Sequence, residues 1–319
     1  MTLNIGYFSF VLLSVSALAQ TPPAAAPRPP ARSLISIYDL EKKTTEVVYT
    51  APDVMEAPNW TPDGKYLMIN GGGKLFRLAV GVKGAQPEEI HTPTPINNDH
   101  AISRDGKLLG LTVRSGPGAG PQTWVAQADG SEPKKLTENY PSYFHAWSPD
   151  GKWMAFTGGR NGNYDLYRVA VTGGEEQRLT SHAAYDDGAD YSPDGKWIYW
   201  NSDRTGNFDI WRMPAAGAGP DDKLAQQVTS DAQEDWFPHP SPDGKWMLVI
   251  SFEPGTKGHP PNKTVQLRIM PLPGAKLKKT EMRVVTTIFG GQGTINVNSW
   301  SPDSKKFAFV SYELKDGGK

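Results

Sequence analysis

Three of the six histidines stand a few residues before a pentapeptide that recurs along the chain: His100, His145 and His239. Imidazoles combined with carboxylates could hold a divalent metal. His100 and His145, however, occupy equivalent positions in two copies of the repeat, two residues before a large apolar residue. That position favours side chains that are buried between packed strands and satisfied by hydrogen bonds. We therefore predict structural histidines and assign neither a metal ligand nor a cofactor.

Adjacent carboxylates at Asp186-Asp187 and at Glu234-Asp235 could act as a general acid and base. Nothing in the sequence fixes the separation that glycoside cleavage requires, and acid pairs in loops are commonly a solvated rim. The sequence has no G-x-S-x-G nucleophile motif. The glycine run that ends at Lys74 lacks the serine or threonine of a phosphate-binding loop. We therefore assign no catalytic residue, and these observations favour a binding protein over an enzyme.

The composition limits the possible partners and the compartment. A formal net charge of -1 over 319 residues gives no reason to expect a nucleic acid or an anionic membrane surface as partner. The absence of cysteine excludes disulfides, thiol catalysis and thiolate metal sites. The fold must therefore be stabilised by packing without disulfides. We expect the chain to be a monomer.

The first residues have the pattern of an exported protein. Residues 5–19 form an uncharged apolar run that is short for a membrane span and ends in an A-x-A cleavage pattern. We predict that residues 1–19 are a signal peptide, and that the Pro/Ala-rich residues 20–33 are an extended linker. The alternative is an uncleaved anchor, because no positive charge precedes the apolar run. The expected location is the periplasm or outside the cell, with no membrane span in the mature chain.

The pentapeptide Ser-Pro-Asp-Gly-Lys, or a close variant, occurs six times, with its aspartate at positions 63, 105, 150, 194, 243 and 303. A repeat of roughly 40 to 50 residues is typical of solenoids and propellers. Ser, Pro, Asp and Gly suit successive positions of a type I turn closed by a glycine of positive φ. Such a turn joins two antiparallel strands.

Each repeat contains four short apolar runs that we interpret as strands. In the third repeat these are residues 143–148, 153–157, 164–171 and 176–180, and the fourth repeat follows the same register. One residue precedes each turn, and we assign this set to packing between sheets rather than to a ligand site: Trp60, Ile102, Trp147, Tyr191, Pro240 and Trp300.

The two ends of the chain complete each other. After the sixth turn only residues 307–312 remain as a clear strand, whereas residues 34–40 and 45–49 precede the first turn and match third and fourth strands. Pairing of these segments would close a ring without a long unpaired edge. The sequence thus predicts one all-β domain over residues 34–319, a six-bladed β-propeller with four-stranded antiparallel blades.

These features resemble the TolB-like family of six-bladed propellers over about residues 34–312. The resemblance rests on the turns preceded by aromatic residues, on the Arg-x-Gly-Asn hairpins at residues 160–163 and 204–207, and on strand endings such as residues 178–180. It is specific for the fold and less so for function, because similar propellers occur in the TolB translocation protein, in prolyl oligopeptidases and in some pectate-degrading lyases. TolB itself carries an α/β domain ahead of its propeller, where this sequence has only the linker.

In a propeller, the loops from fourth to first strands and from second to third strands project on one face, which we call the loop face. These loops differ in every repeat, whereas the turns of the opposite face, the turn face, are nearly constant. Variable loops on a rigid scaffold commonly carry recognition. We therefore predict that the loop face binds a protein or glycan partner.

The alternative function is a polysaccharide lyase or hydrolase with a metal at the channel mouth. His239 stands one residue before the residue that precedes its turn, whereas the other two histidines stand two residues before it, so its side chain should point to the opposite face of the strand. Asp190 holds the same position in the preceding repeat. The predicted partner-binding residues are Asp99, His100, Tyr143, His145, Asp186, Asp187, Asp190, Arg204, Asp235, Trp236 and His239.

Overall fold

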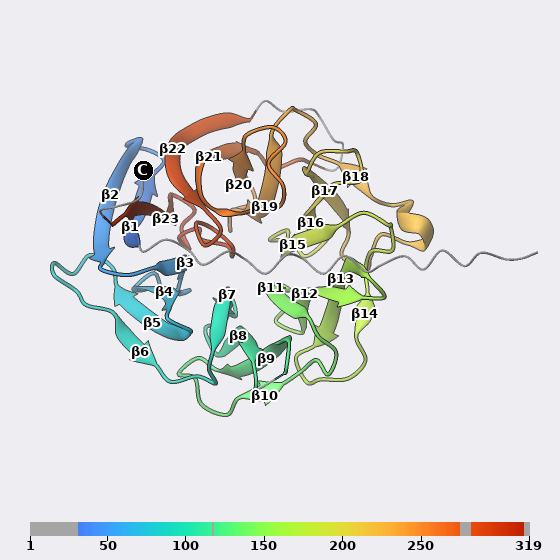
Figure 1. Ribbon diagram of the computed structural model, residues 1–319, viewed down its shortest axis with the longest axis horizontal. Helices are drawn as coiled ribbons and strands as arrows, with labels where there is room; N and C mark the ends of the chain where they lie inside the picture. The colour runs from blue at the N-terminus through green and yellow to red at the C-terminus, as the bar shows by residue number, and fades with distance from the viewer. Residues whose placement is uncertain (1–30, 117, 275–281, 316–319) are drawn as a thin grey trace, which may run out of the picture.

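The structure is a computed structural model that describes residues 31–116, 118–274 and 282–315. Six antiparallel sheets stand as blades around a central axis (Figure 1). In blades 1 to 5 the first strand lies nearest the axis, and later strands lead outward (Figure 1). The predicted six-bladed propeller is confirmed. No helix among these residues is long and apolar enough to cross a membrane, and the predicted signal peptide, residues 1–19, lies outside them.

Blades 1 to 3 follow one another along the chain with four strands each. Blade 1 contains β3 (Met55–Trp60), β4 (Tyr66–Gly71), β5 (Lys74–Ala79) and β6 (Glu88–Ile90). Blade 2 contains β7 (Ile96–Ile102), β8 (Leu108–Arg114), β9 (Pro121–Gln127) and β10 (Lys134–Lys135). Blade 3 contains β11 (Ser142–Trp147), β12 (Trp153–Arg160), β13 (Asn163–Ala170) and β14 (Gln177–Arg178).

Blades 4 and 5 have the same strand order with longer connections. Blade 4 contains β15 (Asp186–Tyr191), β16 (Trp197–Ser202), β17 (Asp209–Pro214), a 3-10 helix η1 (Pro220–Asp222) and β18 (Gln226–Gln227). Blade 5 contains β19 (Glu234–Pro240), β20 (Trp246–Phe252), β21 (Pro261–Pro271) and β22 (Arg283–Gly291).

Blade 6 closes the ring with both ends of the chain. Its sheet has the order β2 (Thr44–Ala51), β1 (Ala31–Asp39), β23 (Lys306–Leu314), with β1 antiparallel to β23. The preceding segment takes the innermost place through a bridge between Trp300 and Phe307. The predicted closure by N-terminal strands is confirmed. β1 begins slightly earlier than expected, so it includes the last residues of the predicted 20–33 linker.

The six turns of the turn face share one set of hydrogen bonds, shown here for blade 4. The Ser192 hydroxyl donates to Asp194 Oδ1 at 2.6 Å, and the Lys196 N–H donates to the same oxygen at 3.1 Å. Gly195 closes the turn at a φ of 70°. Ser304 takes the same conformation at a φ of 61°, and its hydroxyl accepts the Asp243 N–H at 2.9 Å. The single copy without glycine is thus accommodated by a bond between blades.

The core lies between neighbouring blades, so the inner strands are covered on both faces. In β16, for example, Ile198, Tyr199 and Trp200 are all fully buried although successive side chains point to opposite faces. The residues that precede the turns pack as predicted in four blades, where they are buried, and are partly exposed in the other two, at Trp60 and Ile102.

Candidate functional site

The innermost strand of each of blades 1 to 5 carries a β-bulge at the same level. A bulge adds residues to one strand and redirects its side chains. In three strands the bulge places Ala57, Gly188 and Phe237 at φ values of 52°, 68° and 53°. Polar side chains beside the bulges meet around the axis, and we call this set the waist: Asn59, His100, His145, Asp190, His239 and Asn298.

Hydrogen bonds between blades satisfy most of the waist. Asn59 Nδ2 donates to His100 Nδ1 at 3.0 Å. His239 Nδ1 lies 3.1 Å from Asp190 Oδ2, the pairing that the repeat alignment indicates, and Asn298 Nδ2 donates to the same oxygen at 2.9 Å. Burial lowers the pKa of His100 to about 3, so this imidazole is neutral. His100, Asp190 and His239 therefore act as ties between blades, and their burial leaves little surface for a partner.

Asp187 is the most heavily bonded carboxylate near the axis. Its Oδ1 accepts hydrogen bonds from the Thr157 hydroxyl at 2.7 Å and from His145 Nε2 at 2.9 Å. Its Oδ2 lies 3.4 Å from the Tyr185 hydroxyl and 3.6 Å from His259 Nε2. Burial alone would raise the pKa of Asp187, but the hydrogen bonds and charges of His145 and His259 outweigh it and hold this pKa well below the usual range.

A second carboxylate, Asp99, shares this environment. Burial raises the pKa of Asp99 to about 6, although the charge of His145 opposes the shift. Burial also raises the pKa of Tyr143, with further contributions from Asp99 and Asp187. The two carboxylates therefore differ in acidity within one electrostatic environment. Among the residues that the structure describes, no group of three or more His, Asp or Glu side chains is arranged to hold a metal.

An aromatic cluster covers the loop-face side of Asp187 and spans blades 3 to 5. The Tyr164 and Tyr185 rings meet edge to face with centroids 5.0 Å apart, Phe208 lies 4.0 Å from Trp236, and Trp236 lies 4.4 Å from His259. Trp236 is fully buried, whereas the other four side chains are partly exposed. We use the name aromatic cluster for these five residues.

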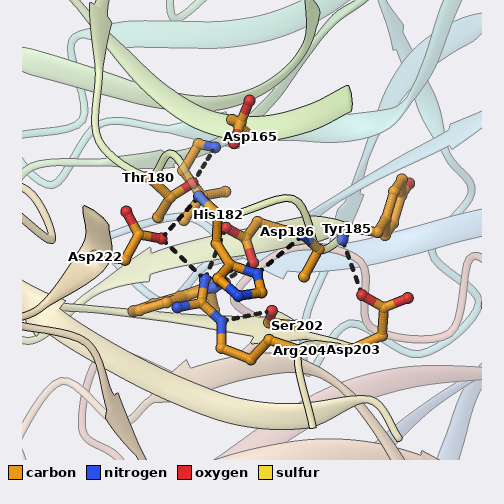
Figure 2. A network of polar contacts seen from close by, with 12 residues as sticks. Asp165, Thr180, His182, Tyr185, Asp186, Ser202, Asp203, Arg204 and Asp222 are labelled. Atoms are coloured by element: carbon orange, nitrogen blue, oxygen red, sulfur yellow. Dashed lines mark hydrogen bonds and ion pairs between the residues drawn. The ribbon is translucent and has the colours of Figure 1, made fainter. Parts of the chain in front are cut away.

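Arg204 and Asp186 lie inside a network of polar contacts (Figure 2). Arg204 Nη2 bonds to Asp186 Oδ1 at 3.0 Å and to Asp222 Oδ2 at 3.2 Å, and Arg204 Nε donates to the Ser202 hydroxyl at 2.9 Å. The side chains of Arg204 and Asp186 are 6% and 0% exposed. Because the network is enclosed, we assign both residues to the scaffold rather than to a partner surface.

Asp235 and Trp236 are also enclosed. Asp235 Oδ1 accepts from Arg268 Nη2 at 2.6 Å and from the Ser251 hydroxyl at 2.7 Å, and burial raises the pKa of Asp235 to about 6. The interpretation of the acid pairs as a solvated rim is wrong for Asp186-Asp187 and for Asp235. These residues belong to β15 and β19, which begin earlier than expected and are buried over their whole length.

The structure thus divides the predicted residues. Asp99, Tyr143, His145 and Asp187 come together near the axis, and of these only Tyr143 is partly exposed. Sequence reasoning missed Tyr164, Phe208 and His259 as members of one cluster. The available signals were the aromatic residue after each Arg-x-Gly-Asn hairpin and the long interval between the aspartates at 243 and 303, which contains His259.

Comparisons with known proteins agree with this architecture. The family described as TolB beta propeller domain matches residues 139–269. An uncharacterised protein of Agrobacterium fabrum is 39% identical over 285 residues, covering 88% of this chain and 92% of that protein. A solved structure from Agrobacterium tumefaciens, provisionally assigned as TolB, is 39% identical with a TM-score of 0.82, covering 89% of this chain and 99% of that one.

A more distant likeness concerns the fold alone. TolB from Acinetobacter baumannii has a TM-score of 0.61 at 19% identity, and the match covers 82% of this chain and 64% of that chain. Taken with the turns, the blade closure and the 39% identity to a nearly full-length relative, these matches settle the family. The chain belongs to the TolB-like β-propeller family.

Proposed function

We propose that this chain is an exported TolB-like propeller that binds a protein partner through its loop face. The observation that carries the proposal is the aromatic cluster, which joins three blades and presents Tyr164, Tyr185, Phe208 and His259 at the surface in partly exposed form. Aromatic side chains that are half buried and held in place by packed neighbours are frequent anchors of protein interfaces.

The arrangement of the rings favours a protein over a glycan. Tyr164, Tyr185 and Phe208 contact one another edge to face, so each ring already uses part of its surface inside the cluster. A sugar ring stacks best on an aromatic face that is open and flat. A peptide segment can instead place apolar side chains between tilted rings and hydrogen-bond to Tyr143 and Tyr185. A glycan partner is the alternative outcome of the binding experiment.

The proposed compartment is the periplasm. The support is the apolar run at residues 5–19 with its A-x-A ending, followed by the Pro/Ala-rich linker. β1, which includes the last residues of the predicted linker, is built into blade 6. Recovery of a mature chain that begins at Gln20 from a periplasmic fraction would support export, and recovery of a cytoplasmic chain that begins at Met1 would contradict it.

A polysaccharide lyase or hydrolase is the second candidate, and one observation favours it. Asp99 and Asp187 differ in acidity and lie in one electrostatic environment with His145, an arrangement that general acid–base catalysis uses. Asp99 and Asp187 are both buried, so a substrate would need access that this conformation does not offer. Turnover of a polysaccharide that is lost in Asp187→Asn would establish the enzyme.

The binding experiment compares the two faces of the propeller. Proteins that co-purify with the tagged mature chain are identified by mass spectrometry, and the affinity of the purified partner is then measured by biolayer interferometry. Tyr164→Ala removes an outer ring of the aromatic cluster and should weaken binding by about tenfold or more, as expected for an interface anchor. Lys152→Ala and Lys196→Ala, on the turn face and both 75% exposed, are the matched controls and should bind normally.

The melting temperature of each variant is measured in parallel. Tyr164→Ala with normal folding and normal affinity would contradict the proposal, as would loss of affinity in the turn-face variants alone. Displacement of the bound protein by an oligosaccharide would indicate a glycan site on the same face.

A further inference from the structure

A cavity of about 400 Å³ lies on the axis at the turn face, opposite the aromatic cluster. All six blades contribute to its wall, each through the residue that precedes the turn and the second residue of the turn. The inner end is formed by members of the waist, including His145 and Asp190. The residues assigned to packing between sheets therefore also border this cavity.

The mouth of the cavity is a ring of prolines with one exception. Five of the six turns have proline as their second residue, and blade 2 has Arg104. Four of these prolines lie against the glycine of the next turn: a Cβ added at Gly195, for example, would lie 3.8 Å from Pro149 Cδ. At Gly151, which follows the Arg104 turn, an added Cβ would meet nothing within 4 Å. Arg104 thus leaves a gap in the ring.

The Arg104 side chain reaches across the mouth. Its Nη1 donates to the carbonyl oxygen of Pro193 at 3.1 Å, which connects blade 2 to blade 4 over the opening. Within the described ranges Arg104 forms no ion pair with a carboxylate. A guanidinium has five N–H donors and keeps its charge at any physiological pH, so most of its donors remain available to an anion. The cavity therefore has an uncompensated positive charge at its entrance.

The interior combines aromatic walls with buried polar atoms that have no hydrogen-bond partner among the described residues, on Trp60, His145 and Tyr191. Trp60, Trp147, Tyr191 and Trp300 line the wall. At the inner end His145 Nδ1 is buried with no hydrogen-bond partner among the described residues. Its Nε2 must donate to the Asp187 carboxylate, which leaves Nδ1 to the cavity side of the ring.

The charge of the inner end follows from its neighbours. Burial lowers the pKa of His145, but the hydrogen bond to Asp187 and the carboxylates of Asp187, Asp99 and Asp190 outweigh burial and raise this pKa above its usual value. Nδ1 is the ring nitrogen that is left without a hydrogen-bond partner among the described residues. The carboxylate of Asp190 is already occupied by the Tyr191 N–H, Asn298 and His239. The donors that remain available to a ligand are those of the Arg104 guanidinium and the indole N–H of Trp60, which has no partner among the described residues.

We propose that this axial cavity is a binding site for a small organic anion, namely a carboxylate on an apolar or aromatic body. The carboxylate binds the Arg104 guanidinium at the mouth, and the body lies against the aromatic wall. A polar atom at the inner end of the ligand would give His145 Nδ1 a hydrogen-bond partner. The volume is within the range of small-molecule sites, which are mostly apolar with a few placed polar groups.

Isothermal titration calorimetry of the mature protein tests the proposal with three probes of equal body: 3-phenylpropionate, 3-phenyl-1-propanol and 3-phenylpropylamine. The carboxylate should bind at least about tenfold more tightly than the alcohol, because a charge-assisted bond to arginine is stronger than a neutral one. The amine should bind most weakly, and added salt should weaken binding of the carboxylate. Equal affinities for the three probes, or no measurable binding of the carboxylate, would overturn the proposal.

Substitutions at the mouth and wall of the cavity test where the ligand binds. Arg104→Pro installs the residue of the other five turns, and Arg104→Gln keeps the length of the side chain without its charge; both should lose about tenfold or more in carboxylate affinity. Ile102→Trp, which copies the residue that blades 1, 3 and 6 carry at this position, should narrow the cavity beside Arg104 and weaken binding of the carboxylate. Lys107→Ala removes a charge from the same turn outside the cavity and is the matched control.

Normal carboxylate binding in Arg104→Gln or in Ile102→Trp, with folding verified, would overturn the proposal. Tyr164→Ala on the loop face should bind the probe normally. This result separates the anion site from the proposed partner surface, because each can fail while the other stands.

Discussion

Replacement of Trp236 by alanine should destabilise the propeller rather than act only on partner binding. The indole is 0% exposed and is enclosed by Phe208 at 4.0 Å and His259 at 4.4 Å between ring centroids. Its Nε1 has no hydrogen-bond partner among the described residues, so the loss is one of packing. Trp→Ala substitutions in cores cost about 3–5 kcal/mol, which corresponds to a fall in melting temperature on the order of 10 °C for a domain of this size.

Urea unfolding followed by circular dichroism measures the loss directly, with Trp236→Phe and Lys152→Ala as comparisons. Phenylalanine refills most of the volume and should cost clearly less than alanine. Lys152 is 75% exposed on the turn face, and its removal should stay within about 0.5 kcal/mol of the parent protein. A Trp236→Ala protein as stable as Lys152→Ala would refute the reasoning, because it would show that the indole is not part of a packed core.

Two further predictions concern Asp99 and the turns. Burial raises the pKa of Asp99 to about 6 in the folded chain, whereas the pKa in the unfolded chain is lower, so ionisation of Asp99 costs stability as pH rises from about 4 to 6. Asp99→Asn should therefore stabilise the protein at pH 7.5, by at most about 3 kcal/mol, and have little effect at pH 4. A gain in stability that is equal at both pH values would contradict the assignment. Gly195→Val should cost about 1–3 kcal/mol because its φ is 70°, whereas Gly195→Asn should cost less; thermal melts that show equal losses would mean that backbone conformation is not the cause.

The fold was predictable because one motif repeats with little change. The Ser-Pro-Asp-Gly-Lys turn requires specific residues at each position, so its six copies mark the strand junctions even where the strands themselves are weakly patterned. The ring closure followed from counting strands on each side of these turns. The turn of Ser304 shows what the pattern left open: a serine adopts the glycine conformation, and its hydroxyl is used by Asp243 of the neighbouring blade.

The site was less predictable because the bulges change which side chains face inward. The alternation of side chains along a strand predicts that His239 and Asp190 lie at the same height in neighbouring blades, and the two are hydrogen-bonded. This alternation cannot predict the bulges at Gly188 and Phe237. Because of these bulges, the acidic residues before them and Trp236 lie in the interior. His259 comes from a long loop between β20 and β21, and no periodic pattern exists there to place it beside Asp187.

Site-specific photo-cross-linking tests the proposed loop-face interaction most directly. The chain would carry p-benzoylphenylalanine in place of Tyr164 on the loop face, or in place of Lys152 or Lys196 on the turn face, and would be irradiated in intact cells. We expect a discrete cross-linked protein from the Tyr164 position and none from the two lysine positions. A cross-linked partner that forms only from the turn-face positions would contradict the proposed function.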